Sequence, residues 1–327
     1  MISCKVKDNE VTGRFAGMNR RQSTFMLHFI VVIFGFTGIL GKLISLDAER
    51  LVFWRVFLGG GLVWLWLMIR RRIQRFEPGV LWKVALVGCF AAAHWIAFFA
   101  SIKVSNVSVA LATLATTPVF VSLIEPLVHR RRLDVREVLL GVVIIVGLLV
   151  LLFGPSTGGA ISDMSDYYQG VALALLSAAL AAVFATFNAV LVKRYDSANL
   201  TRVELLSAAL VLCGIFLVQG KGMNVEFWHV QESDWLWLGL LATLATAFAF
   251  LMSIEVMKNL TAFTTAVAIN LEPVYAIVLA ALIFGEEERM NGSFYVGAVI
   301  IVGAVFIDAW LKKRDRQQAI NSDSHVK

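Results

Sequence analysis

Three features of the sequence predict an all-α integral membrane protein with ten transmembrane helices, arranged as two inverted five-helix repeats. Hydrophobic residues make up 59% of the 327 residues and charged residues only 16%, whereas soluble domains carry about 25% charged residues. Ten apolar stretches are long enough to cross a bilayer, and the second half of the chain repeats motifs of the first. The mean hydropathy of +0.78 places the chain in the same class.

The apolar stretches have roughly 17–24 residues each, which is enough for a helix to cross about 30 Å of hydrocarbon. Lipid offers no hydrogen-bond partner to the backbone, so we expect each stretch to be an α-helix. The stretches cover residues 25–44, 51–69, 80–102, 105–128, 137–153, 169–192, 203–218, 235–257, 262–284 and 293–311. Connections as short as 103–104 and 258–261 predict tight antiparallel hairpins.

The distribution of positive charge predicts a multi-pass protein of the cell (inner) membrane with both termini in the cytoplasm. With the N-terminus inside, 23 of the 29 Lys and Arg residues fall on the cytoplasmic side, five fall outside, and Arg55 lies within a span. Such a bias is typical of cytoplasmic loops. The basic residues form short clusters between apolar runs, so the net charge of +6 indicates orientation in a membrane and no nucleic-acid partner.

Polar segments divide the chain into five parts. Residues 1–24 form a cytoplasmic segment, and because no small-residue cleavage site follows the first apolar run, that run is expected to be retained as a span. Residues 25–153 form the first repeat, and 154–168 form an external linker without Lys or Arg. Residues 169–311 form the second repeat, and 312–327 form a cytoplasmic tail.

The repeat is visible in the residues themselves. The run "PVFVSLIEPLVHRRRLDVREVLLGVVIIVG" from Pro118 parallels "PVYAIVLAALIFGEEERMNGSFYVGAVIIVG" from Pro273, and "GVVIIVG" (141–147) matches "GAVIIVG" (297–303) at six of seven positions. Each half holds five spans, an odd number, so the second half is predicted to be inverted relative to the first. Inverted repeats around a binding site near the bilayer midplane are typical of secondary transporters.

At these residues the chain resembles the EamA-type branch of the drug/metabolite transporter superfamily. The resemblance covers roughly residues 25–311 and rests on "AL…TPVFVSLIEPL" in the fourth span, "NLEPVYAIVLAALIFGEE" in the ninth, and the glycine-rich fifth and tenth spans. It implies an inverted-repeat bundle in the cytoplasmic membrane that moves small metabolites, often outward. Amino acids and related compounds are typical cargo of such proteins.

Three ionisable residues lie deep in the predicted spans. Glu272 is about 15 Å from either face, Arg55 is about 7 Å below the outer interface, and His94 lies in the outer half of the third span. An uncompensated charge at such depth costs at least about 2.5–3.5 kcal/mol. Each of these residues is therefore expected to pair, to become neutral, or to face a watery cavity. Glu125 and Glu255 lie near cytoplasmic ends of spans, where interfacial pairing accounts for them.

Helical spacing groups other side chains with these three. Thr265, Glu272 and Tyr275 share a face of the ninth span, which indicates the lining of a pathway. The alternative is that threonine hydroxyls in the spans bond back to helical carbonyls or cross to neighbouring helices. Thr117 is the counterpart of Glu272 in the repeat, and Asn188 lies on a polar face of the sixth span.

The third span and two prolines add further candidates. His94 shares a face with Phe98, and Trp95 lies alongside, although aromatic residues at helical spacing are more often packing than a substrate site. Pro118 and Pro273 each remove a helical hydrogen bond near mid-membrane. They are either hinges that permit rocking or static bends.

These features predict a secondary transporter that exports small metabolites such as amino acids or related compounds by alternating access. The cavity is expected between the halves, lined by the third, fourth, eighth and ninth spans. Glu272 is expected at its centre, either as a carrier of the coupling proton or as counter-ion to a substrate amine or to Arg55. The alternative is a nucleotide-sugar or organic-phosphate exchanger of the same superfamily, whose anionic cargo would call for several deep cations where only Arg55 is clearly deep.

Other classes of function are not supported by the sequence. HExxH, paired aspartates and a GxSxG turn are missing, so we predict that the protein is not an enzyme. Three cysteines without a CxxC motif predict neither a metal site nor a disulfide framework, and no cofactor is expected. The predicted partners are a small-molecule substrate and the lipid bilayer, while a coupling proton and a homodimer are left open.

Overall fold

The computed structural model describes residues 18–129, 135–152, 164–269, 271–288 and 290–325, and every regular element within these ranges is helical. Seven helical segments there are long and apolar enough to cross a membrane. They are α1 (Arg20–Leu43), α2 (Ala48–Ile69), α3 (Pro78–Val104), the segment Val107–Val128, α7 (Met164–Leu191), α8 (Ser197–Val218) and the segment Asp234–Val256.

Three further helical runs within the described residues are apolar but shorter. They are Leu139–Val150, Tyr275–Phe284 and Gly292–Ala304. These runs lie in α6 (Val135–Leu152), α12 (Glu272–Phe284) and α13 (Gly292–His325), respectively. Two short 3₁₀ turns, η1 (Lys221–Met223) and η2 (Val225–Trp228), follow α8.

Side-chain caps explain where several helices begin. The Asn19 side chain accepts a hydrogen bond from the Gln22 backbone N–H, and the Gln22 side chain accepts one from the Asn19 backbone N–H, which makes a capping box at the start of α1. Asp47 caps α2 and Asp196 caps α8 through the backbone N–H three residues later. Such caps satisfy N–H groups that have no partner inside the helix.

Two of the apolar segments are interrupted helices. α4 (Val107–Leu114) stops before α5 (Thr117–His129), and α11 (Ala262–Ile269) stops before α12. In both cases the second helix begins one residue before a proline, Pro118 or Pro273. Proline disfavours helical geometry in the residue before it and fits best in the first turn of a helix. The sequence predicted continuous, kinked spans, whereas each proline follows a break.

The segment Asp234–Val256 contains a different irregularity. It consists of α9 (Asp234–Leu240), the π-helical η3 (Leu241–Phe248) and α10 (Ala249–Val256). Within η3, the Thr246 hydroxyl donates to the carbonyl of Leu241, five residues earlier, at 2.8 Å. π-Helical turns are rare and occur often at functional sites.

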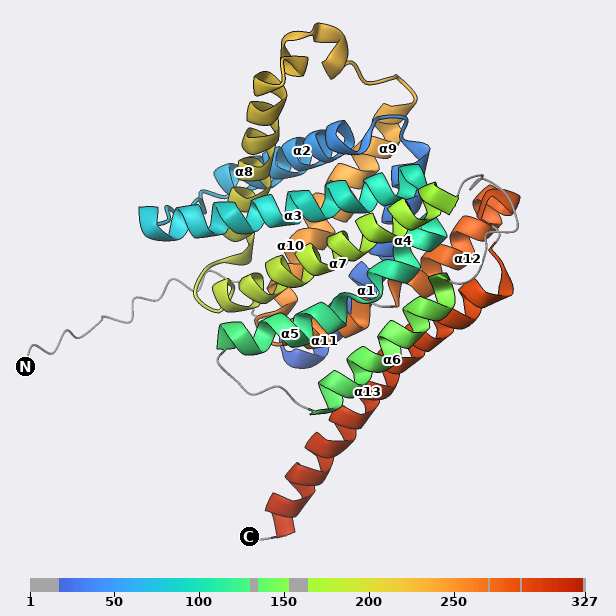
Figure 1. Ribbon diagram of the computed structural model, residues 1–327. Coiled ribbons are helices and arrows are strands. Elements are labelled where there is room, and N and C mark those ends of the chain that lie inside the picture. The colour runs from blue at the N-terminus through green and yellow to red at the C-terminus, as the bar shows by residue number, and fades with distance from the viewer. Residues whose placement is uncertain (1–17, 130–134, 153–163, 270, 289, 326–327) are drawn as a thin grey trace, which may run out of the picture.

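The helices form one bundle in which α3 packs along α7 and α8, and α2 packs against α8 and η3. α13 runs alongside α6 and continues beyond the bundle to the C-terminus (Figure 1). Small residues permit the closest approaches: a Cβ on Gly88 would lie 2.2 Å from the backbone oxygen of Glu204, and one on Gly147 would lie 2.8 Å from Ile301. Close packing of this kind is typical of helices in membranes.

Candidate functional site

A cavity of about 110 Å³ lies in the centre of the bundle. Its walls come from α1, α2, α3, α7 and α10 and from both interrupted pairs, α4–α5 and α11–α12. The lining is mainly apolar and aromatic, with a few polar side chains among which Arg55, His94 and Glu272 are ionisable. The third, fourth, eighth and ninth spans expected from the sequence all contribute. α1, α2 and α7 are additional walls that were not among these four spans.

Arg55 enters the cavity from α2 and is 1% exposed. Its Nε donates a hydrogen bond of 3.0 Å to the Thr246 hydroxyl in η3. The guanidinium carbon lies 4.2 Å from the centre of the Trp95 ring and 5.4 Å from that of Phe99. Neither terminal nitrogen has a hydrogen-bond partner among the residues described, and Nη1 is completely enclosed. The aromatic faces hold the cation without satisfying its N–H groups.

Glu272 lines the same cavity and is 6% exposed. It is the first residue of α12, so its carboxylate lies at the helix terminus where the dipole favours negative charge. It is close enough to Arg55 for mutual electrostatic attraction. Within the described part of the chain, however, no hydrogen bond or ion pair joins the two side chains. The cavity therefore contains a carboxyl group and a guanidinium group that are not in direct contact.

His94 is held in a fixed orientation by Ser177 of α7. Its Nδ1 lies 3.0 Å from the Ser177 carbonyl and 2.8 Å from the Ser177 hydroxyl, and that hydroxyl donates to the His94 carbonyl at 3.1 Å. A carbonyl can only accept, so Nδ1 carries a proton and donates to it. The neutral ring then keeps Nε2 as an acceptor. Phe184 packs against the ring at 5.4 Å between centroids.

The structure brings several other predicted residues to the same cavity. Trp95, Phe98, Thr117, Thr265 and Pro273 all line it. The Thr117 hydroxyl donates to the Leu114 carbonyl at 2.6 Å, and the Thr265 hydroxyl donates to the Thr261 carbonyl at 3.0 Å. Both hydroxyls thus bond to backbone carbonyls three or four residues earlier, as the alternative interpretation expected, and that of Thr117 does so across the break between α4 and α5. Their oxygens remain acceptors that face the cavity wall.

Three predicted residues lie outside the cavity lining. Tyr275 is 44% exposed and packs near Gly35 of α1, so its three-residue spacing from Glu272 in α12 does not bring it to the cavity. Asn188 is fully buried elsewhere, where its amide donates to Glu204 at 3.3 Å. Pro118 follows Thr117 but is not itself part of the lining.

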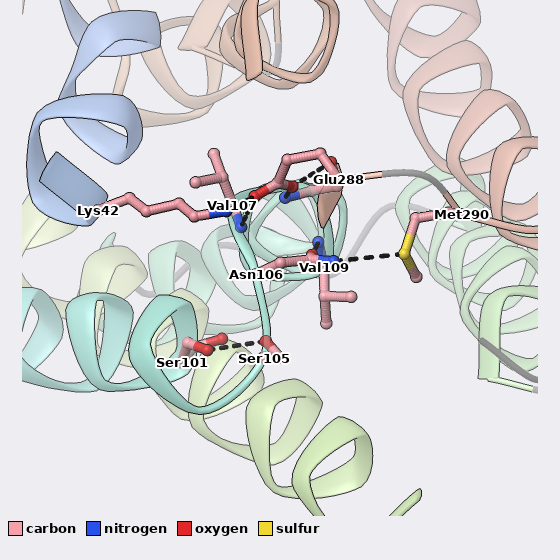
Figure 2. Close-up of polar contacts among 9 residues, drawn as sticks. Lys42, Ser101, Ser105, Asn106, Val107, Val109, Glu288 and Met290 are labelled. Atoms are coloured by element: carbon pink, nitrogen blue, oxygen red, sulfur yellow. Dashed lines mark hydrogen bonds and ion pairs between the residues drawn. The ribbon is translucent and has the colours of Figure 1, made fainter. Parts of the chain in front are cut away.

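Sequence reasoning did not single out Glu288, which forms a polar cluster with Lys42, Val107 and Ser108. The Glu288 carboxylate accepts from the backbone N–H groups of Val107 (3.1 Å) and Ser108 (2.9 Å) and from the Ser108 hydroxyl (2.8 Å). Figure 2 shows Lys42 reaching from α1 to the same carboxylate, with Nζ at 3.0 Å. We call these four residues the Glu288 cluster. It joins η4 (Gly285–Glu288), α1 and the beginning of α4.

A signal for this cluster was present in the sequence. The run "GEEE" follows an apolar stretch and therefore lies at the end of a predicted span, the same end as Lys42. A carboxylate at that level suits the free N–H groups at the start of a helix. Which glutamate would reach which helix depends on tertiary packing, so the pairing itself could not be derived from the sequence.

The same end of the bundle carries a second polar contact. Asp234, the first residue of α9, accepts from the backbone N–H of Ser45 at 3.1 Å and from its hydroxyl at 2.5 Å. Lys103, near the end of α3, donates to the Ile44 carbonyl in the α1–α2 connection. Together with the Glu288 cluster, these contacts tie α1, α3, α4, α9 and η4 together at one end.

Glu204 is a further buried carboxylate that the sequence reading did not single out. It is completely buried in α8, and its Oε1 has no hydrogen-bond partner among the described residues. Its other oxygen accepts from Asn188. It does not line the cavity.

A helical bundle with several membrane-length apolar helices and an aromatic cavity containing separated charges defines a multi-pass membrane protein. The chain belongs to the EamA-like transporter family, which it matches over residues 23–153 and 168–308. It is therefore an EamA-type transporter of the drug/metabolite transporter superfamily, as its resemblance to that family predicted.

Two curated relatives and a solved structure agree with this assignment. The chain is 26% identical over 300 residues to the "Probable biotin transporter" of Pseudomonas aeruginosa, which covers 89% of this chain and 98% of the relative. It is 21% identical over 275 residues to the "Uncharacterized transporter YxxF" of Bacillus subtilis, covering 82% and 84%. A crystal structure shares the fold with a TM-score of 0.63 over 90% of this chain and 99% of the other, at 18% identity.

Proposed function

We propose that this protein is a secondary transporter that exports a small amphipathic metabolite, such as an amino acid or a related compound, by alternating access of the central cavity. The observation that carries the proposal is the separated Arg55–Glu272 pair in an aromatic cavity bounded by two interrupted helices. Broken helices around a buried site are a recurrent feature of secondary transporters. They leave backbone groups free where a substrate or ion can bind.

The proposed architecture has ten spans in two inverted five-helix units, residues 25–153 and 169–311. The seven long helical segments and the three shorter apolar helices supply ten candidates. The breaks before Pro118 and Pro273 occupy equivalent positions in the sequence repeat, which supports a common plan for the two halves. In this arrangement both termini lie in the cytoplasm, as the distribution of Lys and Arg favours.

In that orientation the Glu288 cluster and the Asp234–Ser45 contact lie at the external face. The cavity lining extends to Met257, at the end of α10, which is roughly 30 Å along the helical segment from Asp234. The external end is thus closed by polar contacts, and the cavity reaches toward the cytoplasm. This is the state from which an exporter would load its substrate.

The small size of the cavity supports a transport mechanism in which the surrounding helices move. Sites for drug-sized ligands usually measure about 300–1,000 Å³, whereas this cavity measures about 110 Å³. A substrate would therefore have to widen it. We assign this movement to the two helix breaks, with Pro118 and Pro273 as hinges.

Glu272 is the residue that we propose for coupling. A carboxylate that lines a cavity without an ion-pair partner can take up a proton or bind a substrate amine as the cavity opens and closes. His94 and Thr265 lie in the same wall and supply neighbouring polar groups. A proton would then be the coupling ion, and a homodimer is not required for this mechanism.

The test is transport by the purified protein in proteoliposomes. Compounds are first chosen by comparing their toxicity to cells with and without expression of this protein. Biotin is added because one relative is named a probable biotin transporter. Flux is then measured between about pH 5.5 and about pH 8.5, a range in which buried carboxyl groups titrate. Glu272→Gln is expected to abolish the pH dependence and to slow flux, whereas the exposed Glu49→Gln control is expected to behave as wild type. Wild-type flux with an unchanged pH profile in Glu272→Gln would remove this residue from the mechanism.

The alternative of a nucleotide-sugar or organic-phosphate exchanger receives less support. Among the described lining residues, Arg55 is the only Lys or Arg. A cargo with two or more negative charges would be poorly balanced by that single cation, especially with Glu272 nearby. Competition by nucleotide sugars or phosphate esters in the same flux assay would favour the alternative.

A further inference from the structure

The guanidinium group of Arg55 has hydrogen-bond donors in the cavity that no described residue satisfies. It makes one hydrogen bond, from Nε to Thr246, and the terminal nitrogens have none within the described chain. A buried polar group without a partner costs free energy, and the cost is larger for a charged group. The contacts with Trp95 and Phe99 and the attraction of Glu272 offset part of this cost. They do not supply an acceptor for the N–H groups.

The geometry of the missing partner follows from the guanidinium itself. Arginine presents a rigid, planar fork of donors that matches a carboxylate with two parallel hydrogen bonds. With Nε engaged by Thr246, the two terminal nitrogens are the pair left to bind such a group. Glu272 has a carboxylate, but it forms no ion pair with Arg55 in this state. Nη2 is not enclosed and is open to an acceptor from outside the chain, whereas Nη1 is enclosed in this state and is reached by a second acceptor atom only as the cavity widens.

The charge around this position limits the acceptor to a single negative charge. Arg55 is the sole Lys or Arg in the described lining. Glu272 adds a negative group close by. A phosphate dianion would leave excess negative charge in a buried space, whereas one carboxylate matches one guanidinium.

The other lining residues indicate the chemistry of the part of the substrate that carries the carboxylate. Trp95 packs on Phe250 at 5.1 Å between ring centroids, and Phe250 packs on Phe184 at 6.0 Å, which makes a continuous aromatic wall beside Arg55. Phe34 and Phe98 also line the cavity. Aromatic walls gain free energy by covering apolar surface and rings. A hydrocarbon chain or ring fits this wall better than a sugar or another strongly hydrated group.

We propose that Arg55 is the carboxylate receptor of the substrate site, and that the transported substrate is a monocarboxylate with an apolar body. This assignment rests on the proposed transport function and narrows its substrate class. In the empty site Glu272 and the aromatic faces partly balance the guanidinium. Binding of substrate replaces that incomplete balance with a direct, two-point hydrogen-bonded pair. An α-amino group on the same substrate would be attracted by Glu272, so amino acids are included in the class.

The experiment compares carboxylates with their amides, which have nearly the same shape and lack the negative charge of the carboxylate. The probes are 3-phenylpropanoate with 3-phenylpropanamide, octanoate with octanamide, and phenylalanine with phenylalaninamide. Binding to the purified full-length protein in detergent is measured as the rise of the thermal unfolding midpoint with ligand concentration, since a ligand that binds the folded state stabilises it. The first two pairs test the carboxylate alone, and the third adds the amine.

We expect at least one carboxylate to stabilise the wild-type protein more than its amide does. In Arg55→Gln, affinity for that carboxylate should fall about tenfold to a hundredfold, toward that of the amide, because a hydrogen-bonded charge is lost. Arg55→Lys keeps the charge but not the fork and should show an intermediate loss. Arg50→Gln is the matched control on the same helix: Arg50 pairs with Asp47 outside the cavity, so affinity should not change.

Equal stabilisation by acids and amides, or none by any acid, would overturn the assignment of Arg55. So would an Arg55→Gln protein that binds the acids as tightly as wild type. The wild-type comparison of acids with amides remains decisive even where Arg55→Gln does not fold. Flux of amides or cations in proteoliposomes would contradict this inference and leave the transporter proposal in place. Acid-selective binding without any flux would uphold the receptor and contradict the transport proposal.

Discussion

Glu272 and Glu288 lie at the two ends of the same short stretch, α12 and η4, and are buried to a similar degree, with 6% and 1% exposure. Their surroundings differ completely. Glu288 accepts three hydrogen bonds from the start of α4 and pairs with Lys42. Glu272 has no hydrogen bond or ion pair within the described residues and lines a cavity. Burial by itself therefore does not distinguish a carboxylate that holds the structure together from one available for chemistry.

The difference lies in how completely the charge is balanced. A buried carboxylate with a cation and several N–H donors costs much to disturb, because each donor would be left without a partner. A carboxylate beside a cavity, with its counter-ion near but not in contact, can change protonation or partner at a lower cost. We therefore expect substitutions at Glu288 to act on stability and substitutions at Glu272 to act on transport.

The largest expected effect is that of Glu288→Ala. The change leaves the buried N–H groups of Val107 and Ser108 without their acceptor and removes the carboxylate that pairs with Lys42, so the free energy of unfolding should fall by about 3 kcal/mol. It can be measured by SDS titration in mixed micelles. Glu226→Ala, at an exposed glutamate, serves as control. A loss no larger than that of the control would mean that the cluster does not hold this end closed.

An intermediate effect is expected for Lys42→Met. Methionine keeps an apolar side chain beside Phe284, over which the Lys42 ammonium lies at 4.2 Å, but removes the charge. Glu288 retains its three donors from α4, so the loss of unfolding free energy should be about 1–2 kcal/mol. The same titration measures it. A loss equal to that of Glu288→Ala would show that the cation, and not the helix start, stabilises the carboxylate.

The smallest effect on stability is expected for Glu272→Gln. The amide removes a buried charge that has no direct partner, so the free energy of unfolding should change by less than about 1 kcal/mol or should rise. Transport should nevertheless change in the same protein. A destabilisation as large as that of Glu288→Ala would show that Glu272, like Glu288, mainly stabilises the fold.

Much of the fold could be predicted from the sequence because hydrophobicity dominates it. The apolar stretches predicted where the membrane-length helices lie, and the EamA resemblance was confirmed by the family match. The same reasoning expected Glu255 to pair near the end of a span, and it pairs with Lys258 at 2.6 Å. These predictions depend on composition and on neighbours along the chain, which the sequence contains.

The site was less accessible to sequence reasoning because it depends on contacts between distant segments. Arg55, His94 and Glu272 were selected by depth alone, and the structure brings them to one cavity. Tyr275 was selected by helical spacing from Glu272, but within α12 it packs near α1 and does not line the cavity. Thr246, which orients Arg55, and Lys42, which reaches Glu288, are ordinary residues until the packing of their helices is known.

The π-helical segment η3 shifts the second half of its span around the helix axis. A hydrogen bond that skips five residues instead of four includes one additional residue in the turn. Every later residue is therefore displaced by about one position from the face that an unbroken α-helix would give it. Phe250, Ser253 and Met257 point into the cavity because of this extra residue. Deleting a single residue between 241 and 248 should turn them away, so cysteine labelling at these positions should change more with such a deletion than with any substitution there.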